Sequence, residues 1–106
     1  MISTHILDTA LGRPASGVSV SLYDQNGQRL AQAQTDQDGR IKDFGYSDFK
    51  AQHYSLEFET ASYFEKQSCA TFFPKAVIHF SIVDPEQHYH IPLLISPYAY
   101  STYRGS

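Results

Sequence analysis

The sequence predicts an all-β fold, an antiparallel sandwich of two sheets with one short helix. Apolar and polar residues alternate with a period of two in several segments, which is the pattern of strands that bury one face. Asn-Gly and Asp-Gly turn signals separate such segments at intervals of roughly 8–12 residues, as in antiparallel sandwiches. The length of 106 residues is close to the commonest domain size, so we expect a single domain over residues 1–106.

The first two predicted strands form a hairpin. Residues 18–24 (VSVSLYD) place two valines and a leucine on one face and polar groups on the other. Asn26-Gly27 follows, which is typical of a two-residue hairpin turn in which both central residues have a positive φ. Residues 29–35 (RLAQAQT) are the returning strand, and Asp38-Gly39 marks a second turn.

Three more strands are expected in the second half of the chain, at residues 53–60 (HYSLEFET), 76–84 (AVIHFSIVD) and 88–96 (HYHIPLLIS). Each alternates large apolar residues with polar ones, so each has one face for the core. Pro92 lies inside the last strand, and proline has no N–H for a sheet ladder. We therefore expect a sheet edge or a bulge at Pro92.

The helix is predicted at residues 62–69 (SYFEKQSC). Ser62 has the side chain of an N-cap, and Glu65 stands three residues later, as in a capping box. The segment is short, so we expect only about two turns.

Bulk composition excludes several classes of function. The net charge of -3 gives no basic surface for nucleic acid or for anionic membranes, and no apolar run is long enough to span a bilayer. We therefore expect no nucleic-acid partner and no membrane association. The N-terminus lacks the basic and apolar regions of a secretory signal, and the single cysteine, Cys69, allows no intrachain disulfide. These features favour a cytoplasmic location, with Cys69 as a small buried apolar residue.

His88 and His90 are the first candidates for chemistry. Two residues apart on a strand, they leave the same face, opposite to Ile91. That face meets either solvent or another subunit. Such a pair can hold zinc with a third ligand such as His5, but two histidines alone are a weak signal, and solvated surface histidines are the simpler interpretation.

His5 and Arg40 are the other candidates in the first half of the chain. Alone, His5 is typical of a structural histidine, and Arg40, which follows the Asp-Gly turn, of a solvated arginine. The sequence contains no P-loop, no dinucleotide-binding glycine motif, no serine-hydrolase elbow and no calcium loop. We therefore expect either chemistry without a cofactor or a binding module.

The C-terminal segment concentrates planar and hydrogen-bonding groups, namely Tyr98, Tyr100, Tyr103 and Arg104. As a last edge strand, it would pack its tyrosines on the sheet. Tyrosine and arginine are also enriched at protein interfaces. Oligomerisation and ligand binding therefore compete as explanations for this tail.

Five segments of the chain resemble the transthyretin-like family, specifically its 5-hydroxyisourate hydrolase branch: STHILDTALGRPA (3–15), TDQDGRI (35–41), FFP (72–74), HYHIPLLIS (88–96) and YSTYRGS (100–106). The resemblance runs from end to end. The closing Tyr-Arg-Gly-Ser distinguishes the enzyme branch from the hormone-carrier branch, which lacks it. The resemblance implies a transthyretin-like sandwich that assembles as a homotetramer, a dimer of dimers with active sites in the channel between the dimers.

The resemblance also implies a reaction, the hydrolysis of 5-hydroxyisourate to 2-oxo-4-hydroxy-4-carboxy-5-ureidoimidazoline in urate degradation, with no cofactor and no metal. Carried over motif by motif, the expected catalytic residues are His5, Arg40 and His90. The expected substrate-binding residues are Tyr103, Arg104, Gly105 and Ser106.

The chemistry of these residue types suits that reaction. A neutral imidazole is a suitable base for water near neutral pH, so we expect His5 and His90 to share the proton transfers. Paired N–H donors of Arg40 and Arg104 would orient the planar ring and stabilise the developing oxyanion. Hydroxyl groups such as those of Tyr103, Ser96 or Ser106 would complete the pocket.

Two other classes of function stay open at this point. A non-catalytic carrier would bind an apolar ligand in the same channel, but imidazole and guanidinium groups are poor walls for it. A plain interaction module would explain the sandwich and its turns but not the polar C-terminal signature.

Overall fold

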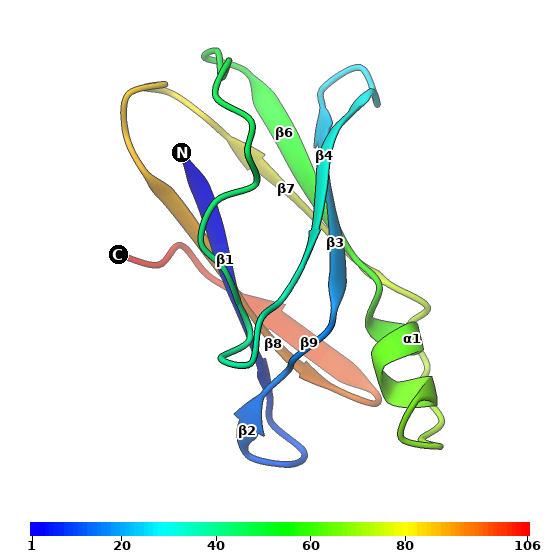
Figure 1. Ribbon diagram of the computed structural model, residues 1–106. Helices are drawn as coiled ribbons and strands as arrows, with labels where there is room; N and C mark the ends of the chain where they lie inside the picture. The colour runs from blue at the N-terminus through cyan, green and yellow to red at the C-terminus, as the bar shows by residue number, and fades with distance from the viewer.

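Two β-sheets face each other in the computed structural model, which describes residues 1–106 (Figure 1). The first sheet has the order β2-β1-β8-β9, and β5 also pairs with β1. Its strands are β1 (Ile2–Asp8), β2 (Arg13–Pro14), β5 (Arg40–Ile41), β8 (Tyr89–Ser96) and β9 (Ala99–Thr102). The second sheet, in the order β4-β3-β6-β7, contains β3 (Ser19–Asp24), β4 (Arg29–Gln34), β6 (His53–Phe58) and β7 (Ala76–Ser81). The predicted sandwich is confirmed.

The core lies between the sheets and follows the period-two pattern. On β3 and β6 the predicted inward residues, including Val20, Leu22 and Leu56, are completely buried. On β8 the same holds for Leu93 and, nearly, for Ile95. Twenty buried apolar residues form one cluster. Because each strand buries only alternate residues, the outer face of the first sheet is free to carry polar groups.

The pairing of β1 with β8 is parallel, whereas every other strand pair is antiparallel. This is the one departure from the predicted antiparallel arrangement. The register places Ser3 beside His90 and His5 beside Pro92. Residues from the two ends of the sequence therefore share one patch of the sheet.

The helix α1 spans Thr60–Glu65, so it begins before the predicted residues 62–69, and the capping-box prediction is wrong. Its N-cap is Glu59, whose side chain makes no capping hydrogen bond. Tyr63 and Phe64 are buried against the sandwich. Packing of these two rings, rather than a cap at Ser62, accounts for where this short helix lies.

The hairpin turn between β3 and β4 forms where predicted, but with a different geometry. Gly27 has a positive φ of 83°, whereas Asn26 does not have a positive φ. The Asp24 carboxylate accepts hydrogen bonds from the backbone N–H groups of Asn26 and Gln28, both at 2.9 Å. These hydrogen bonds stabilise a turn that is longer than the predicted two-residue turn. The register of the β3–β4 pairing shifts between Leu22 and Tyr23.

Pro92 lies in an interior strand, so the predicted edge position is wrong. The His90 carbonyl accepts a hydrogen bond from the Gly105 N–H. Backbone groups two residues apart on a strand point to the same neighbour, so the backbone nitrogen of Pro92 lies at the same edge of β8 as the His90 carbonyl. β9 ends at Thr102, and the chain leaves the sheet before Gly105 returns. The missing N–H of Pro92 thus coincides with a gap in the ladder.

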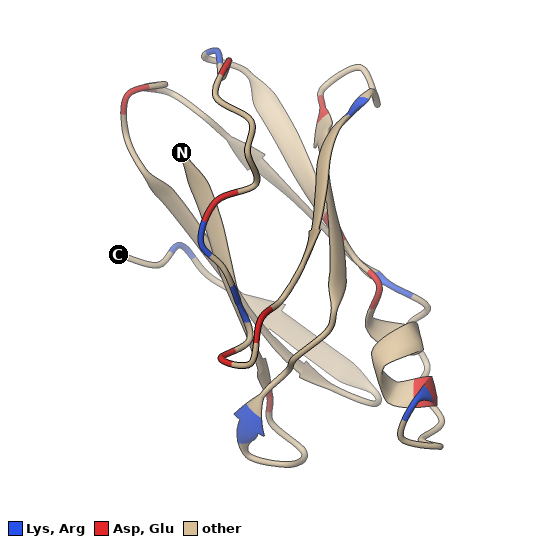
Figure 2. Cartoon of the chain, in the orientation of Figure 1, with Lys and Arg blue, Asp and Glu red and all other residues tan.

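Charged residues lie mostly in the connecting loops and near strand ends (Figure 2). Cys69 is partly exposed, so the expectation of full burial is wrong, although its side chain packs against the core. No helix is both long enough and apolar enough to cross a membrane.

Candidate active site

The start of β1 brings three polar side chains into one hydrogen-bonded cluster. Ser3 faces the outer side of the sheet, opposite to the buried Ile2 and Thr4. Its Oγ lies 2.7 Å from His88 Nε2 and 2.7 Å from His90 Nδ1. The expected common face of the two histidines is therefore observed, and one serine hydroxyl bridges their rings.

The loop before β8 holds His88 in place. The Tyr89 hydroxyl accepts hydrogen bonds from the N–H groups of Val83 and Asp84 and donates one to the Asp84 carbonyl. The Tyr89 N–H donates to the Met1 carbonyl at 2.9 Å. The parallel ladder thus begins at Met1, next to the histidine cluster.

Arg40 reaches the same face through the turn before β5. The Asp36 carboxylate accepts hydrogen bonds from the N–H groups of Asp38 and Arg40, and the bond from Arg40 is the main reason that the Asp36 pKa is lowered. Gly39 has a φ of 73°, and a Cβ at this position would lie 2.5 Å from the Ile6 carbonyl oxygen. Only glycine fits so close to β1. The docked turn sets Arg40 opposite His5 in the β1–β5 ladder.

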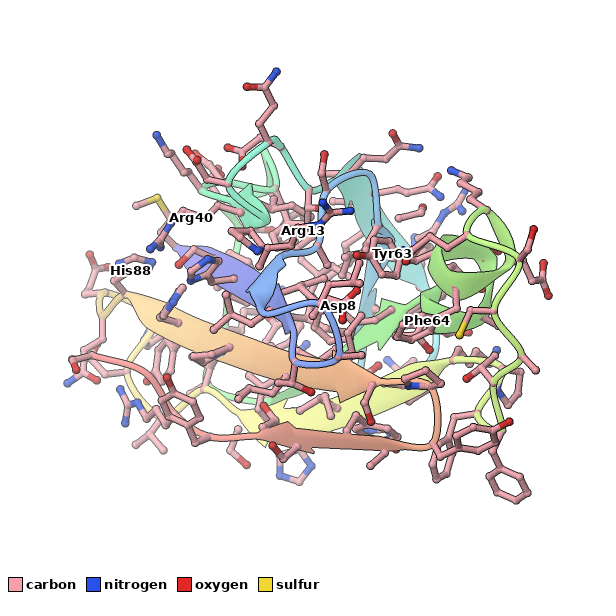
Figure 3. The ribbon with its side chains drawn as sticks, turned by 90° about the horizontal axis from the view of Figure 1, so that it is seen from below. Asp8, Arg13, Arg40, Tyr63, Phe64 and His88 are labelled. Atoms are coloured by element: carbon pink, nitrogen blue, oxygen red, sulfur yellow. The ribbon has the colours of Figure 1, made fainter.

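These groups surround a cavity of about 410 Å³ at the start of β1. Arg40 and His88 lie at the same end of this strand (Figure 3). Most of the lining residues are polar or charged. The full set of lining residues is Met1, Ser3, Thr4, Arg40, Ile41, Lys42, His88, His90 and Ser106.

The C-terminal tail closes one side of the cavity. Gly105 pairs with His90, its N–H lying 2.8 Å from the His90 carbonyl oxygen. A Cβ on Gly105 would lie 2.5 Å from His90 Cδ2 and 3.1 Å from Pro92 Cγ. The absence of a side chain therefore lets the backbone pass directly against the imidazole and bring Ser106 to the cavity.

Of the seven expected catalytic and substrate-binding residues, three line this cavity, namely Arg40, His90 and Ser106. His88, the other candidate histidine of the HYH segment, lines it as well. Gly105 contacts His90 but does not line the cavity. His5 is half-buried on the same face of β1, next to Arg40 in the ladder, but does not line it either.

Tyr103 and Arg104 lie in a neighbouring cavity of about 310 Å³, which shares only His90 with the first. The Arg104 guanidinium is 4.7 Å from the centre of the Tyr89 ring and donates a hydrogen bond to Gln87. Ser96, considered as a pocket hydroxyl, lies at the far end of β8 and bonds to the Ala99 carbonyl. That expectation is wrong, because eight residues of extended chain carry Ser96 away from His88.

The surroundings of His90 favour its neutral form. Partial burial is the largest cause that lowers its pKa below the ordinary value of 6.5, and the charge of Arg40 is the next. The charges of His88 and His5 act in the same direction. Burial and nearby cations both penalise an imidazolium ion, so His90 keeps a free ring nitrogen at neutral pH. Its Nε2 has no hydrogen-bond partner within the chain.

No group of three or more His, Cys, Asp or Glu side chains is placed to hold a metal ion together. The zinc interpretation of His5, His88 and His90 therefore finds no ligand set in this chain. A serine hydroxyl occupies the position between the two rings of the HYH segment.

Ser3 and Lys42 line the cavity but were not singled out from the sequence. Ser3 precedes His5 by two residues, so strand parity alone places both on one face. The missing information was the parallel register of β1 and β8, which sets Ser3 beside His90.

Comparison with known proteins agrees with the fold and the motifs. The model of the HIUase/Transthyretin family matches residues 2–105. A 5-hydroxyisourate hydrolase of Salmonella dublin is 46% identical, in an alignment that covers 100% of this chain and 81% of the relative. A solved structure of Klebsiella pneumoniae 5-hydroxyisourate hydrolase has a TM-score of 0.91 and 44% identity, and covers 99% of this chain and 98% of its own.

A transthyretin has the same fold. The crystal structure of sea bream transthyretin in complex with thyroxine has a TM-score of 0.90 and 31% identity, with 98% of this chain and 93% of that one covered. The sandwich alone therefore does not distinguish an enzyme from a carrier. Taken together, the family model, the full-length identity and the shared architecture show that this chain belongs to the HIUase/Transthyretin family.

Proposed function

We propose that this chain, as a single domain over residues 1–106, hydrolyses 5-hydroxyisourate to 2-oxo-4-hydroxy-4-carboxy-5-ureidoimidazoline. The observation that carries the proposal is the cavity in which His90 and Arg40 meet the C-terminal Ser106. Relatives that are 46% and 44% identical over nearly the whole chain are named for this reaction, which supports the substrate.

The proposed reaction begins with water beside His90. The substrate is a planar oxidised purine with an electrophilic ring carbonyl. The free Nε2 of His90 takes a proton from water, and the hydroxide attacks that carbonyl. The neutral state of His90, favoured by burial and by Arg40, supplies the base near neutral pH. The proton then passes to the departing ring nitrogen as the ring opens.

Arg40 is the proposed electrostatic partner of the reaction. Its guanidinium provides parallel N–H donors that match the oxygen and nitrogen edge of the substrate ring and the oxyanion formed on attack. Lys42 and the Ser106 hydroxyl line the same cavity and complete its polar wall. No cofactor and no metal enter this scheme.

His5, Tyr103 and Arg104 have proposed roles that depend on assembly. The proposed homotetramer would place a second subunit against the outer face of the first sheet, where His5 lies half-buried. Tyr103 is exposed in the single chain, as is the edge strand β9 before it. The family resemblance and these uncovered tyrosines support a dimer of dimers in which Tyr103 and Arg104 contact substrate with His5. Sedimentation or light scattering tests the assembly, and a monomer in solution would contradict a shared site.

The hydrolysis is tested by following 5-hydroxyisourate made freshly from urate with urate oxidase. Because the compound also decays unaided, the rate with the protein is compared with the rate without it. The expected result is clear acceleration, lost in a variant that lacks residues 103–106. A tetramer that does not accelerate the decay would favour the alternative, a non-catalytic transthyretin-like carrier, and its channel would then be tested for thyroxine-like ligands.

We further propose a cytoplasmic location. Its support is the single cysteine, which allows no intrachain disulfide and is typical of proteins in a reducing compartment. Fractionation of the cell with an antibody against the protein tests it.

A further inference from the structure

We propose that Ser3 and His88 are positioning residues for His90 and form a relay that moves to His88 the positive charge that His90 gains when it takes a proton from water. This inference rests on the proposed hydrolysis, because it assigns a route to that reaction's proton. The geometry behind it is the pair of 2.7 Å contacts from one hydroxyl to two imidazole rings.

The hydroxyl of Ser3 couples the protonation of the two rings. A serine hydroxyl has one proton to donate and two lone pairs to accept. Ser3 is 6% exposed, and its Oγ has no third partner, so its proton points to one of the two ring nitrogens. The other ring must then donate its N–H to Oγ. The tautomers of His88 and His90 are therefore chosen together.

Only one of the two arrangements leaves His90 as a base. If Ser3 donates to His90 Nδ1, the proton of neutral His90 lies on Nε2, and no lone pair faces the cavity. If His90 Nδ1 donates to Ser3, and Ser3 donates to His88 Nε2, then His90 Nε2 is free. His88 thus selects the reactive tautomer of His90 by accepting the Ser3 proton, much as an orienting group does in a catalytic triad.

The second arrangement also transfers a proton with all charges balanced. Nε2 of His90 takes one proton from water, leaving hydroxide. His90 Nδ1 releases its proton to Ser3 Oγ, and Ser3 releases its own to His88 Nε2. The products are hydroxide, neutral His90 with the proton on Nε2, the unchanged hydroxyl of Ser3, and an imidazolium at His88. The Nε2 proton then lies in the cavity. As His90 gives this proton to the departing nitrogen, the relay runs in reverse: His88 Nε2 returns a proton to Ser3 Oγ, and Ser3 gives one to His90 Nδ1, so that both rings end neutral in their starting tautomers.

The burial of the three residues fits proton transfer from His90 through Ser3 to His88. His88 is exposed, whereas His90 is half-buried and Ser3 is buried. Solvent therefore stabilises a positive charge at His88 better than at His90. The charged groups that face the relay are Arg40 and Lys42 from the chain around β5 and His5 from β1. Arg40 and His5 penalise a charge at His90.

The kinetic test uses four variants. Ser3→Ala breaks the relay, Ser3→Thr keeps the hydroxyl, His88→Gln bonds to Ser3 but takes up no proton, and Ser47→Ala in an exposed loop is the matched control. We expect kcat to fall roughly ten- to a hundredfold in Ser3→Ala and His88→Gln, a part of what a general base contributes. KM should change little. Ser3→Thr should recover most of the rate, and the control should match the wild type. Full activity in both Ser3→Ala and His88→Gln would overturn the relay.

A second measurement needs no substrate. Nitrogen-15 NMR of histidine-labelled protein reports which ring nitrogen carries the proton. We expect His90 to carry it on Nδ1 at neutral pH, and Ser3→Ala to shift it toward Nε2 in a folded protein. A wild-type His90 with Nε2–H, unchanged by Ser3→Ala, would overturn the relay even if the protein hydrolyses 5-hydroxyisourate. An inactive wild-type protein would instead overturn the proposed function.

Discussion

The two ends of β1 carry similar hydrogen bonds with opposite roles. At its start, the Ser3 hydroxyl bridges two imidazole rings. At its end, the Asp8 carboxylate accepts the Tyr63 hydroxyl at 2.7 Å and the N–H groups of Ala10 and Leu11 at 3.0 Å each. Figure 3 shows Asp8 and Tyr63 together, away from Arg40 and His88.

The two clusters have similar hydrogen-bond lengths but differ in how many of their polar atoms have a hydrogen-bond partner. Asp8 is 1% exposed and both of its oxygens are occupied, so it fastens the β1–β2 turn to α1. Burial is the main cause that raises the pKa of Tyr63, and the bond to Asp8 adds to it, so this phenol stays protonated. His90, by contrast, keeps an unpaired nitrogen beside a cavity. A polar group with nothing left to bind stabilises the fold, and one with a free site is available for chemistry.

The variant with the largest expected effect changes His90, beside the start of β1, and should affect activity without affecting stability. His90→Asn should fold and assemble normally but lose roughly a hundred- to ten-thousandfold in hydrolysis, because it removes the proposed base. The decay of fresh 5-hydroxyisourate measures the rate, and thermal unfolding measures the fold. Full activity in this variant would leave His5 as the sole base.

Gly105→Ala should reduce hydrolysis by up to about a hundredfold, because displacing a reacting group by about 1 Å can cost this much. The added Cβ would press on His90 Cδ2, so the ring or the tail must move. Stability should change little, since the tail is mostly exposed. Gly45→Ala, in an exposed loop with open space around it, is a control for glycine replacement away from the site. Unlike Gly105, Gly45 has a positive φ of 79°, so this variant should lose some stability but keep its activity. Equal activity in Gly105→Ala and the wild type would show that the tail need not touch His90.

At the Asp8 end the expected effect is on stability alone. Tyr63→Phe leaves one carboxylate oxygen of Asp8 buried without a partner, which should cost about 1–3 kcal/mol. Urea unfolding measures the cost, and the rate of hydrolysis should remain that of the wild type. A loss of rate in a stably folded Tyr63→Phe protein would mean that the two ends of β1 are coupled.

The smallest effect is on pH dependence. Since the pKa of His90 is lowered, mainly by burial and then by Arg40, the neutral base should persist below pH 6.5, and the acid limb of kcat/KM should lie there. Between pH 6.5 and the lower folded value, the unfolded chain binds more protons, so stability should fall as pH falls through this window. Arg40→Met should raise the His90 pKa. NMR titration of His90 measures the shift, and an unchanged pKa would remove Arg40 as a cause.

The fold was predictable wherever alternation decided it. Residues such as Leu22, Leu56 and Leu93 have to be inside, and the strands follow. The helix start was not predictable from its cap, because burial of Tyr63 and Phe64 outweighs the propensity of Ser62. Pro92 was misread as an edge residue because the gap in the ladder opposite it depends on where β9 ends.

The site was predictable only through its motifs. His90 and Arg40 carry recognisable sequence contexts, but each alone indicates a surface residue. Ser3 was missed because its partner lies 87 positions away, and no local pattern reports a parallel register. His5, Tyr103 and Arg104 do not line the cavity in the single chain, so their proposed roles rest on the proposed assembly.

The parallel pairing of β1 with β8 has a consequence for how the protein matures. β1 is made before the other strands, whereas β8, which covers one edge of β1 and supplies His90, is made almost last. Until then β1 has an unpaired edge, which is the kind of surface that recruits other strands. Closing so long a loop is also slow relative to forming the β3–β4 hairpin. In a refolding experiment, hydrolysis should therefore return last, after secondary structure, and β1 should be the segment most in need of protection by a chaperone.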